Sequence, residues 1–160
     1  MVVDSHSFRN ALGCFASGVT VVTAVTKSGE PVGVTVSAFS SLSLNPPLVL
    51  VCLDKNTSNL EAYRAGAFAV NLLTESQKEI SIRFATRPGN RWDNTEHVMG
   101  EGGCPLLTGC LANLECTLEA THEAGDHVII VGRVRELRYA AGGQPLLYFR
   151  SAYAGLGRLL

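Results

Sequence analysis

The run from Gly33 to Asp54, GVTVSAFSSLSLNPPLVLVCLD, constrains the fold more than any other part of the chain. Val34–Ser37 alternates branched and small polar residues at the period of two that is typical of a half-buried strand. The pair Pro46-Pro47 cannot donate to a sheet, so it marks the start of a second strand, whose apolar run Leu48–Leu53 indicates burial. Between the strands we expect a hydroxyl-rich turn, either an ordinary loop or part of a small-ligand site, containing Ser40, Ser41 and Ser43.

Strand patterns also dominate the rest of the chain. Val19–Thr26 is rich in β-branched residues, and Lys27–Glu30 connects it as a hairpin to Pro31–Ala38. Polar and apolar residues alternate over Ala112–Ala120, which predicts a long half-exposed strand that turns at Ala124–Asp126. Further strands are expected at Ala67–Leu73, Val128–Leu137 and Leu146–Phe149. Because short turns join many strands, the pattern predicts a mainly β fold, a small antiparallel barrel flanked by a few helices.

The first helix is expected at the amino terminus. Asp4 or Ser5 can cap it, and Gly18 supplies the stop. Its apolar residues recur at spacings of four and three, at Phe8, Leu12 and Phe15. Such a stripe should cover one end of the sheet.

Two more helices and one long loop complete the expected elements. A short helix begins near Leu60 and ends at Gly66, and a third helix spans Glu75–Ala85. Residues 86–103 show no periodicity, although the only tryptophan, Trp92, lies there. A loop of this length usually has a role, either as a lid over a ligand or as a dimer contact.

Length and composition narrow the class of protein. The 160 residues suit a single domain, 1–160, that buries roughly two thirds of its unfolded surface. The 46% of hydrophobic and 17% of charged residues favour a buried subunit interface. A formal net charge of −1 lacks the basic excess of a nucleic-acid-binding protein, and no apolar run reaches about 18 residues, so neither nucleic acid nor membrane is expected as a partner. Residues 1–15 are typical of an amphipathic helix and not of a secretory signal, which predicts a cytoplasmic location.

The cysteines do not indicate a disulfide framework or a metal site, because their number is odd and no C-x-x-C pair occurs. They are Cys14, Cys52, Cys104, Cys110 and Cys116. We interpret them as small core residues, with an exposed, redox-active Cys104 as the alternative. The sequence also lacks a G-x-S-x-G elbow, a P-loop and an H-E-x-x-H motif, and Gly100–Gly103 has no strand-turn-helix context, so a Rossmann dehydrogenase is not expected.

Two other positions suit an anionic ligand. Thr57 and Ser58 begin the short second helix, whose backbone amides attract anions, although an ordinary N-cap is an equal alternative. Arg83 and Arg87 lie at the end of the third helix, where guanidinium groups either bind phosphate oxygens or simply complement the helix dipole.

The motifs together resemble the flavin reductase-like family, short NAD(P)H:flavin oxidoreductases on the FMN-binding split barrel. Thr35–Val49 is similar to the family pattern T-V-S/N-S/A-F-x-S-x-S-x-x-P-P-L-V. The resemblance continues through FASGVTVVTA upstream and through FAVNLL, RFA, LANLEC, GDHVI and PLLYF downstream, so it covers nearly the whole chain.

This resemblance implies a Greek-key split β-barrel that transfers a hydride from NADH or NADPH to FMN, or to FAD, and supplies reduced flavin to a partner monooxygenase. It also implies a homodimer with the flavin at the two-fold interface. The alternatives are a flavin-binding module without fast turnover, or a flavin-dependent reductase of another acceptor such as a corrinoid or a ferric chelate.

The resemblance also assigns residues. His127, which by spacing alone is a structural histidine after a turn, is expected beside the nicotinamide as the catalytic residue, with Asp126 either orienting it or only ending the turn. Tyr153 corresponds to an aromatic position near the flavin, or alternatively packs on the barrel mouth. The residues expected to bind the flavin are Thr35, Val36, Ser37, Ala38, Cys52, Leu53, Thr57, Ser58, Arg83, Phe84, Ala85, Arg87 and Tyr153.

Overall fold

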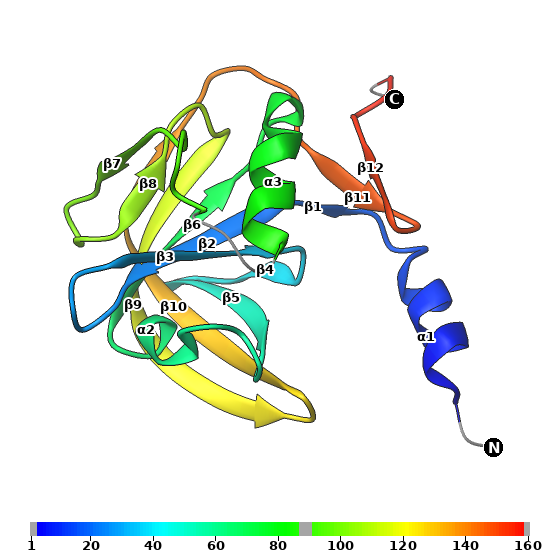
Figure 1. Cartoon of the computed structure of the whole chain (residues 1–160), viewed down its shortest axis with the longest axis horizontal. Coiled ribbons are helices and arrows are strands. Elements are labelled where there is room, and N and C mark those ends of the chain that lie inside the picture. Colours follow the sequence, from blue (N-terminus) through cyan, green and yellow to red (C-terminus); the bar gives the residue numbers. More distant parts are fainter. Residues whose placement is uncertain (1–2, 87–90, 159–160) are drawn as a thin grey trace.

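The structure, a computed structural model, describes residues 3–86 and 91–158. It is mainly β, with a few helices (Figure 1). The helices are α1 (Ser5–Leu12), α2 (Leu60–Tyr63) and α3 (Lys78–Ala85), and the 3₁₀ turn η1 (Glu75–Gln77) leads into α3. The strands are β1 (Ser17–Gly18), β2 (Thr20–Val25), β3 (Pro31–Val36), β4 (Phe39–Leu44), β5 (Pro47–Asp54), β6 (Ala67–Leu72), β7 (His97–Met99), β8 (Pro105–Leu107), β9 (Ala112–Ala124), β10 (His127–Tyr139), β11 (Leu147–Phe149) and β12 (Ala152–Ala154).

Antiparallel pairing organises these strands into one large sheet and two small ones. The large sheet has the order β3-β2-β6-β9-β10-β5-β4, so β3 and β4, which are consecutive in sequence, stand at its opposite ends. The small sheets are β1-β11-β12 and β7-β8. At the tip of the β9–β10 hairpin, His127 is paired with Ala124 on one side and with Asp54 of β5 on the other. The order therefore brings the end of β5 beside the start of β10.

Strand β2 lies between two hydrophobic clusters, which explains why it is buried on both faces. Val22 and Ala24 pack into the larger cluster with residues of β5, β6 and β10. Val21 packs into a second cluster with Phe84 of α3. Burial of a valine side chain contributes roughly 1.5–3 kcal/mol, so both clusters stabilise this central strand.

Helix α3 is fixed against β3 by close contacts. A Cβ on Gly33 would lie 2.5 Å from the ring of Phe84, so glycine is needed where the helix meets the strand. The Thr35 hydroxyl donates to the Ser81 carbonyl at 2.6 Å. The Arg91 guanidinium donates to the Gly33 carbonyl at 2.8 Å, which ties the segment after α3 to the same strand. Position 35, a predicted site residue, is thereby rigidly placed.

The first helix differs from the sequence prediction. Helix α1 ends at Gly13 and not at Gly18, since β1 then pairs with β11. All of its residues are exposed, and Phe8, Leu12 and the following Phe15 are 54%, 56% and 79% exposed. Figure 1 shows α1 standing away from the sheet. The prediction that this helix covers one end of the sheet is wrong, because its apolar side chains stay exposed among the residues that the structure describes.

The predicted hydroxyl-rich turn is also wrong, because the serines belong to strand β4. This strand pairs with β5, and its register shifts between Ser41 and Ser43. The long loop predicted at 86–103 contains a further strand, β7, paired with β8. These short segments at sheet edges carry little periodicity, so sequence pattern alone does not reveal them.

The cysteines are mostly internal. Cys104 and Cys116 are buried, and burial, followed by the nearby Glu115 carboxylate, raises the pKa of Cys104 to about 11. Cys104 is therefore a core residue and not an exposed redox group. Cys14 is exposed, contrary to the core interpretation. Within the described ranges, no helix is long and apolar enough to cross a membrane.

Candidate functional site

A hollow of about 210 Å³ lies between the end of β3, the end of β5 and the start of β10. It brings together predicted site residues that are far apart in the sequence, because β10 pairs with β5 at this point. The predicted residues that line it are Thr35, Val36, Ser37, Ala38, Cys52, Leu53, Thr57 and His127, together with Val34 and Asp54. The grouping of the β3 end with His127 is the central feature of the site.

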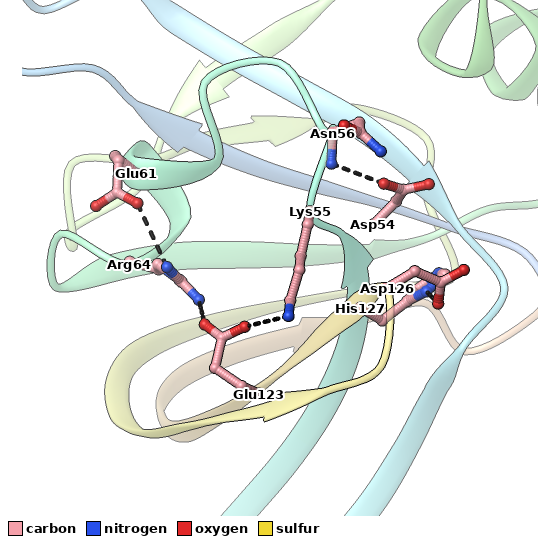
Figure 2. A network of polar contacts seen from close by, with 8 residues as sticks. All are labelled: Asp54, Lys55, Asn56, Glu61, Arg64, Glu123, Asp126 and His127. Carbon is pink, nitrogen blue, oxygen red and sulfur yellow. Dashed lines mark hydrogen bonds and ion pairs between the residues drawn. The ribbon is translucent and has the colours of Figure 1, made fainter.

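His127 lies at the open edge of this hollow, and its side chain is 44% exposed. Its Nδ1 is 2.7 Å from Asp126 Oδ1, and the pair is drawn in Figure 2. The hydrogen bond from the imidazole and its charge hold the pKa of Asp126 below the usual value of 3.8. With Nδ1 donating to this carboxylate, Nε2 is the ring nitrogen that can meet a ligand.

The β3 side of the hollow offers both backbone and side-chain groups. Ser37 and Ala38 are exposed between β3 and β4, where the ladder is interrupted. The Thr35 hydroxyl proton is donated to Ser81, so only its oxygen lone pairs can serve a ligand. The Cys52 amide donates to the Ala38 carbonyl at 3.0 Å. The Cys52 amide is therefore engaged within the chain, whereas the half-buried Cys52 still lines the hollow.

The last residue of β5 is an acid that the sequence prediction missed. Asp54 lines the hollow, and its carboxylate accepts the Asn56 amide at 2.7 Å while its carbonyl accepts the Thr57 amide at 2.8 Å. These amides are thus not the open phosphate cradle that the helix-start pattern predicts. An Asp directly after a buried strand and before Asn-Thr-Ser was the available signal, since this pattern favours an Asx turn.

Several predicted residues lie outside the hollow. Arg83 donates through Nη1 to the Asp93 and Asn94 carbonyls and to Thr95 Oγ1 at 2.9, 3.3 and 2.7 Å, so it holds the segment after α3. Phe84 is fully buried and packs in the second hydrophobic cluster. Ser58 and Ala85 are exposed and do not line the hollow, and Arg87 lies outside the described residues.

Tyr153 is connected to the site through α3. Its hydroxyl lies 2.8 Å from Ser81 Oγ, and the Ser81 carbonyl accepts the Thr35 hydroxyl. Its ring packs against Tyr148 and lies 5.8 Å from Lys78 Nζ. Tyr153 thus packs between the carboxyl-terminal strands and α3, one helix away from the hollow.

A larger apolar groove of about 560 Å³ adjoins the hollow. The two share Ser37, Ala38 and Cys52. The groove extends between α1, β4, β5 and β11, with Leu12 and Phe15 on its walls. Because small-molecule sites usually measure about 300–1,000 Å³, the groove alone has the volume of such a site, and the hollow extends it toward His127.

Comparison with known proteins gives a consistent result over nearly the whole chain. Residues 12–157 match the family model for the flavin reductase like domain. The FMN reductase (NADH) SmoA from Agrobacterium fabrum is 44% identical over 156 residues, which cover 97% of this chain and 88% of that protein. The reductase subunit HsaB of a flavin-dependent monooxygenase from Rhodococcus jostii is 39% identical over 155 residues, which cover 96% of this chain and 79% of HsaB.

Solved structures agree. The NADH:FAD oxidoreductase SgcE6 from Streptomyces globisporus, in complex with NAD and FAD fragments, has a TM-score of 0.91 at 33% identity, covering 98% of this chain and 97% of that one. The relatives differ in length: this chain spans only 51% of a probable flavin reductase from Rhizobium meliloti to which it is 44% identical over 163 residues.

Proposed function

Because the chain belongs to the flavin reductase-like family, we propose that it is an NAD(P)H:flavin oxidoreductase that supplies reduced flavin to a partner monooxygenase. One observation carries the proposal: the β3 end, the end of β5 and His127 enclose one hollow that opens into an apolar groove. The lining is the kind that a planar, partly polar ring system needs, with exposed backbone at Ser37 and Ala38 beside apolar walls.

The lining residues fit a flavin. The backbone at Ser37 and Ala38, the Thr35 oxygen and the Thr57 hydroxyl would hold its polar edge, each contributing on the order of 1 kcal/mol net. Leu12 and Phe15 in the groove would cover apolar ring surface. When bound, the flavin accepts a hydride from the reduced nicotinamide, which leaves oxidised.

The role of the protein in this reaction is orientation. His127 Nε2, held by the Asp126 contact at Nδ1, would bind the nicotinamide carboxamide and place it against the flavin side of the hollow. Removal of water from the groove would strengthen this hydrogen bond. A positioned contact of this kind supports the assignment of His127 as the catalytic residue.

We also propose the family's homodimer, its split β-barrel type and a single domain over 1–160. The exposed apolar α1 and the adjoining groove support a subunit contact, since a helix with an apolar stripe gains stability by covering it. A cytoplasmic location stays a prediction, and so do the absence of membrane and nucleic-acid partners. FMN is the proposed flavin, because the sequences Lys55–Asn59 and Arg83–Arg87 do not predict a second pocket for an adenosine half.

The proposed function is tested by oxidation of NADH and of NADPH with FMN or FAD present. We expect oxidation well above the rate with free flavin alone. A rate equal to that of free flavin, with flavin nevertheless bound, would instead identify a flavin-binding module. Isothermal titration with both flavins tests the choice of FMN, and a preference for FAD of about tenfold or more would overturn it.

A further inference from the structure

Glu123, at the end of β9, joins three separate segments around the His127 end of the site (Figure 2). Its Oε2 accepts Lys55 Nζ at 2.9 Å, and its Oε1 accepts Arg64 Nη2. Lys55 lies in the loop after β5, and Arg64 directly follows α2. One carboxylate therefore links the β9–β10 hairpin, the loop after β5 and the end of α2.

The linked segments are the ones that form the open edge of the hollow. Asp54 lines it from the end of β5, Thr57 from the loop that follows, and His127 from the hairpin. The Lys55 amide donates to the Asp126 carbonyl at 2.9 Å, so backbone and side chain of Lys55 connect the loop to the hairpin at two points. Any movement of the tip against the loop would change the distance between the imidazole and the flavin side of the hollow.

The charges make Glu123 the main partner of both cations. Hydrogen bonds from Lys55 and from Arg64 lower the pKa of Glu123 below its usual value of 4.5, so it is ionised at neutral pH. The other acid near Arg64, Glu61, is 81% exposed and lies at 3.4 Å, whereas the Arg64 side chain is only 25% exposed. Within the described chain Arg64 Nε is buried without a hydrogen-bond partner, so this guanidinium depends strongly on the carboxylates at its other nitrogens.

We infer that Glu123 is a positioning residue, which acts through the hairpin tip to hold His127 in place for the nicotinamide. This inference rests on the proposed function. A carboxylate that only stabilises the surface would affect unfolding but not the nicotinamide step. The two roles therefore predict different kinetics.

The experiment compares Glu123→Gln with a matched control on the same strand. Glu119 also pairs with an arginine, accepting Arg133 Nε and Nη2 at 2.8 and 2.7 Å, but Arg133 lies within β10, away from the hairpin tip and the loop after β5. In stopped-flow reduction of flavin-saturated protein, Glu123→Gln should lower the second-order rate constant for NADH about three- to tenfold, because misplacement of an orienting group costs rate. Flavin affinity should stay within about twofold. Glu119→Gln should leave both values unchanged.

A double-mutant cycle tests whether Glu123 acts through His127. In a His127→Ala background, Glu123→Gln should have little further effect, since the group it positions is gone. Full additivity of the two changes would overturn the inference, and so would an unchanged rate in Glu123→Gln alone. If His127→Ala itself leaves reduction unchanged, the proposed role of His127 falls together with this inference, whereas flavin reductase activity stands.

A third measurement, hydrogen exchange, does not depend on catalysis. Hydrogen exchange of amides 124–128 should become faster in Glu123→Gln and stay unchanged in Glu119→Gln, because only the former releases the tip from the loop. Glu123→Asp keeps the charge with a shorter reach and should recover part of the rate. Should Glu123→Gln fail to fold, Glu123→Asp carries the same comparison, and wild-type kinetics together with wild-type exchange in it would overturn the inference.

Discussion

The His127 end of the molecule and the α1 end expose opposite kinds of surface. At the hairpin tip the exposed side chains are polar and bonded to one another, as with Glu123 and Lys55 or Asp126 and His127 (Figure 2). Near α1, by contrast, large apolar side chains are exposed among the polar ones: Leu12 is 56% and Phe15 is 79% exposed, beside a groove of about 560 Å³.

This difference shows what each end needs. The charged side chains at the hairpin tip pair with one another within one chain, so the geometry of the tip does not depend on a partner. A helix of eight residues that buries none of its side chains gains little stability by itself, because isolated helices of this length are marginal in water. We therefore expect that a second surface covers the apolar side chains at the α1 end.

The largest effect is expected from a substitution at the polar hairpin tip. His127→Ala should lower kcat/KM for the reduced nicotinamide by about 10 to 100-fold, because orientation and one electrostatic contact supply roughly 1.4 to 3 kcal/mol of transition-state stabilisation. Flavin affinity should stay nearly unchanged, since the β3 end lies on the other side of the hollow. Stopped-flow reduction at saturating flavin measures this. An unchanged reduction rate removes His127 from the mechanism, and a joint loss of stability and flavin binding makes it structural.

The second largest effect is expected from a substitution in α1, at the end with exposed apolar side chains. Leu12→Glu places a charge in the proposed subunit contact and should convert the dimer to a chain of 17.0 kDa, with flavin affinity weakened about tenfold. Met99→Glu is the matched control: it is equally exposed, at 57%, but lies on β7, far from α1 in Figure 1. Sedimentation and flavin titration measure both. A Leu12→Glu protein of wild-type mass would contradict the proposed role of α1.

The same contrast explains which parts of the fold and of the site could be predicted from the sequence. The long strands β9 and β10 were predicted within a few residues, because residues 112–120 alternate polar and apolar side chains and residues 128–131 form an apolar run, and both patterns are typical of strands. The motif from Thr35 to Ala38 and the histidine at 127 were predicted to share a site, and the pairing of β5 with β10 brings them into one hollow.

The sequence predictions were wrong where burial does not determine the order of polar and apolar residues. The stripe of α1 was assigned to the sheet because a sequence does not say whether an apolar face packs on its own chain. The sequence predicts a turn at the serines of β4, because a strand at the edge of a sheet need not alternate polar and apolar residues. Arg83 has the chemistry of a phosphate ligand, yet its partners are two backbone carbonyls and the Thr95 hydroxyl, which no local pattern specifies.

A smaller effect, on flavin affinity, is expected from a substitution on the β3 side of the hollow. Thr35→Val removes the hydroxyl while keeping the shape of the side chain, and leaves the Ser81 carbonyl without this donor. Flavin affinity should fall about fivefold, corresponding to about 1 kcal/mol for one hydrogen bond, while the dependence of reduction on NADH stays the same. Ser58→Ala, outside the hollow, should change flavin affinity less than twofold. Equal losses in both variants would place a flavin contact in the loop before α2.

The smallest effect compares the two ends by acid titration. Hydrogen bonds from Lys55 and Arg64 lower the pKa of Glu123, and hydrogen bonds from Ser7 and His6 lower the pKa of Asp4, the N-cap of α1. A carboxylate with a lowered folded pKa stabilises the fold above its ordinary pKa, 4.5 for Glu123 and 3.8 for Asp4, and loses this contribution as the pH falls below that value.

Only Glu123 belongs to the cooperatively folded sheet, so Glu123→Gln should flatten the fall of the urea midpoint below about pH 4.5, with the two proteins converging at the lowest pH. Asp4→Asn should leave this curve unchanged, because α1 is exposed along its whole length and can unfold before the core does. The measurement is best made in the Leu12→Glu background, where no second chain covers the helix. If Asp4→Asn flattens the acid limb as much as Glu123→Gln does, α1 unfolds together with the sheet, and the two ends are not independent.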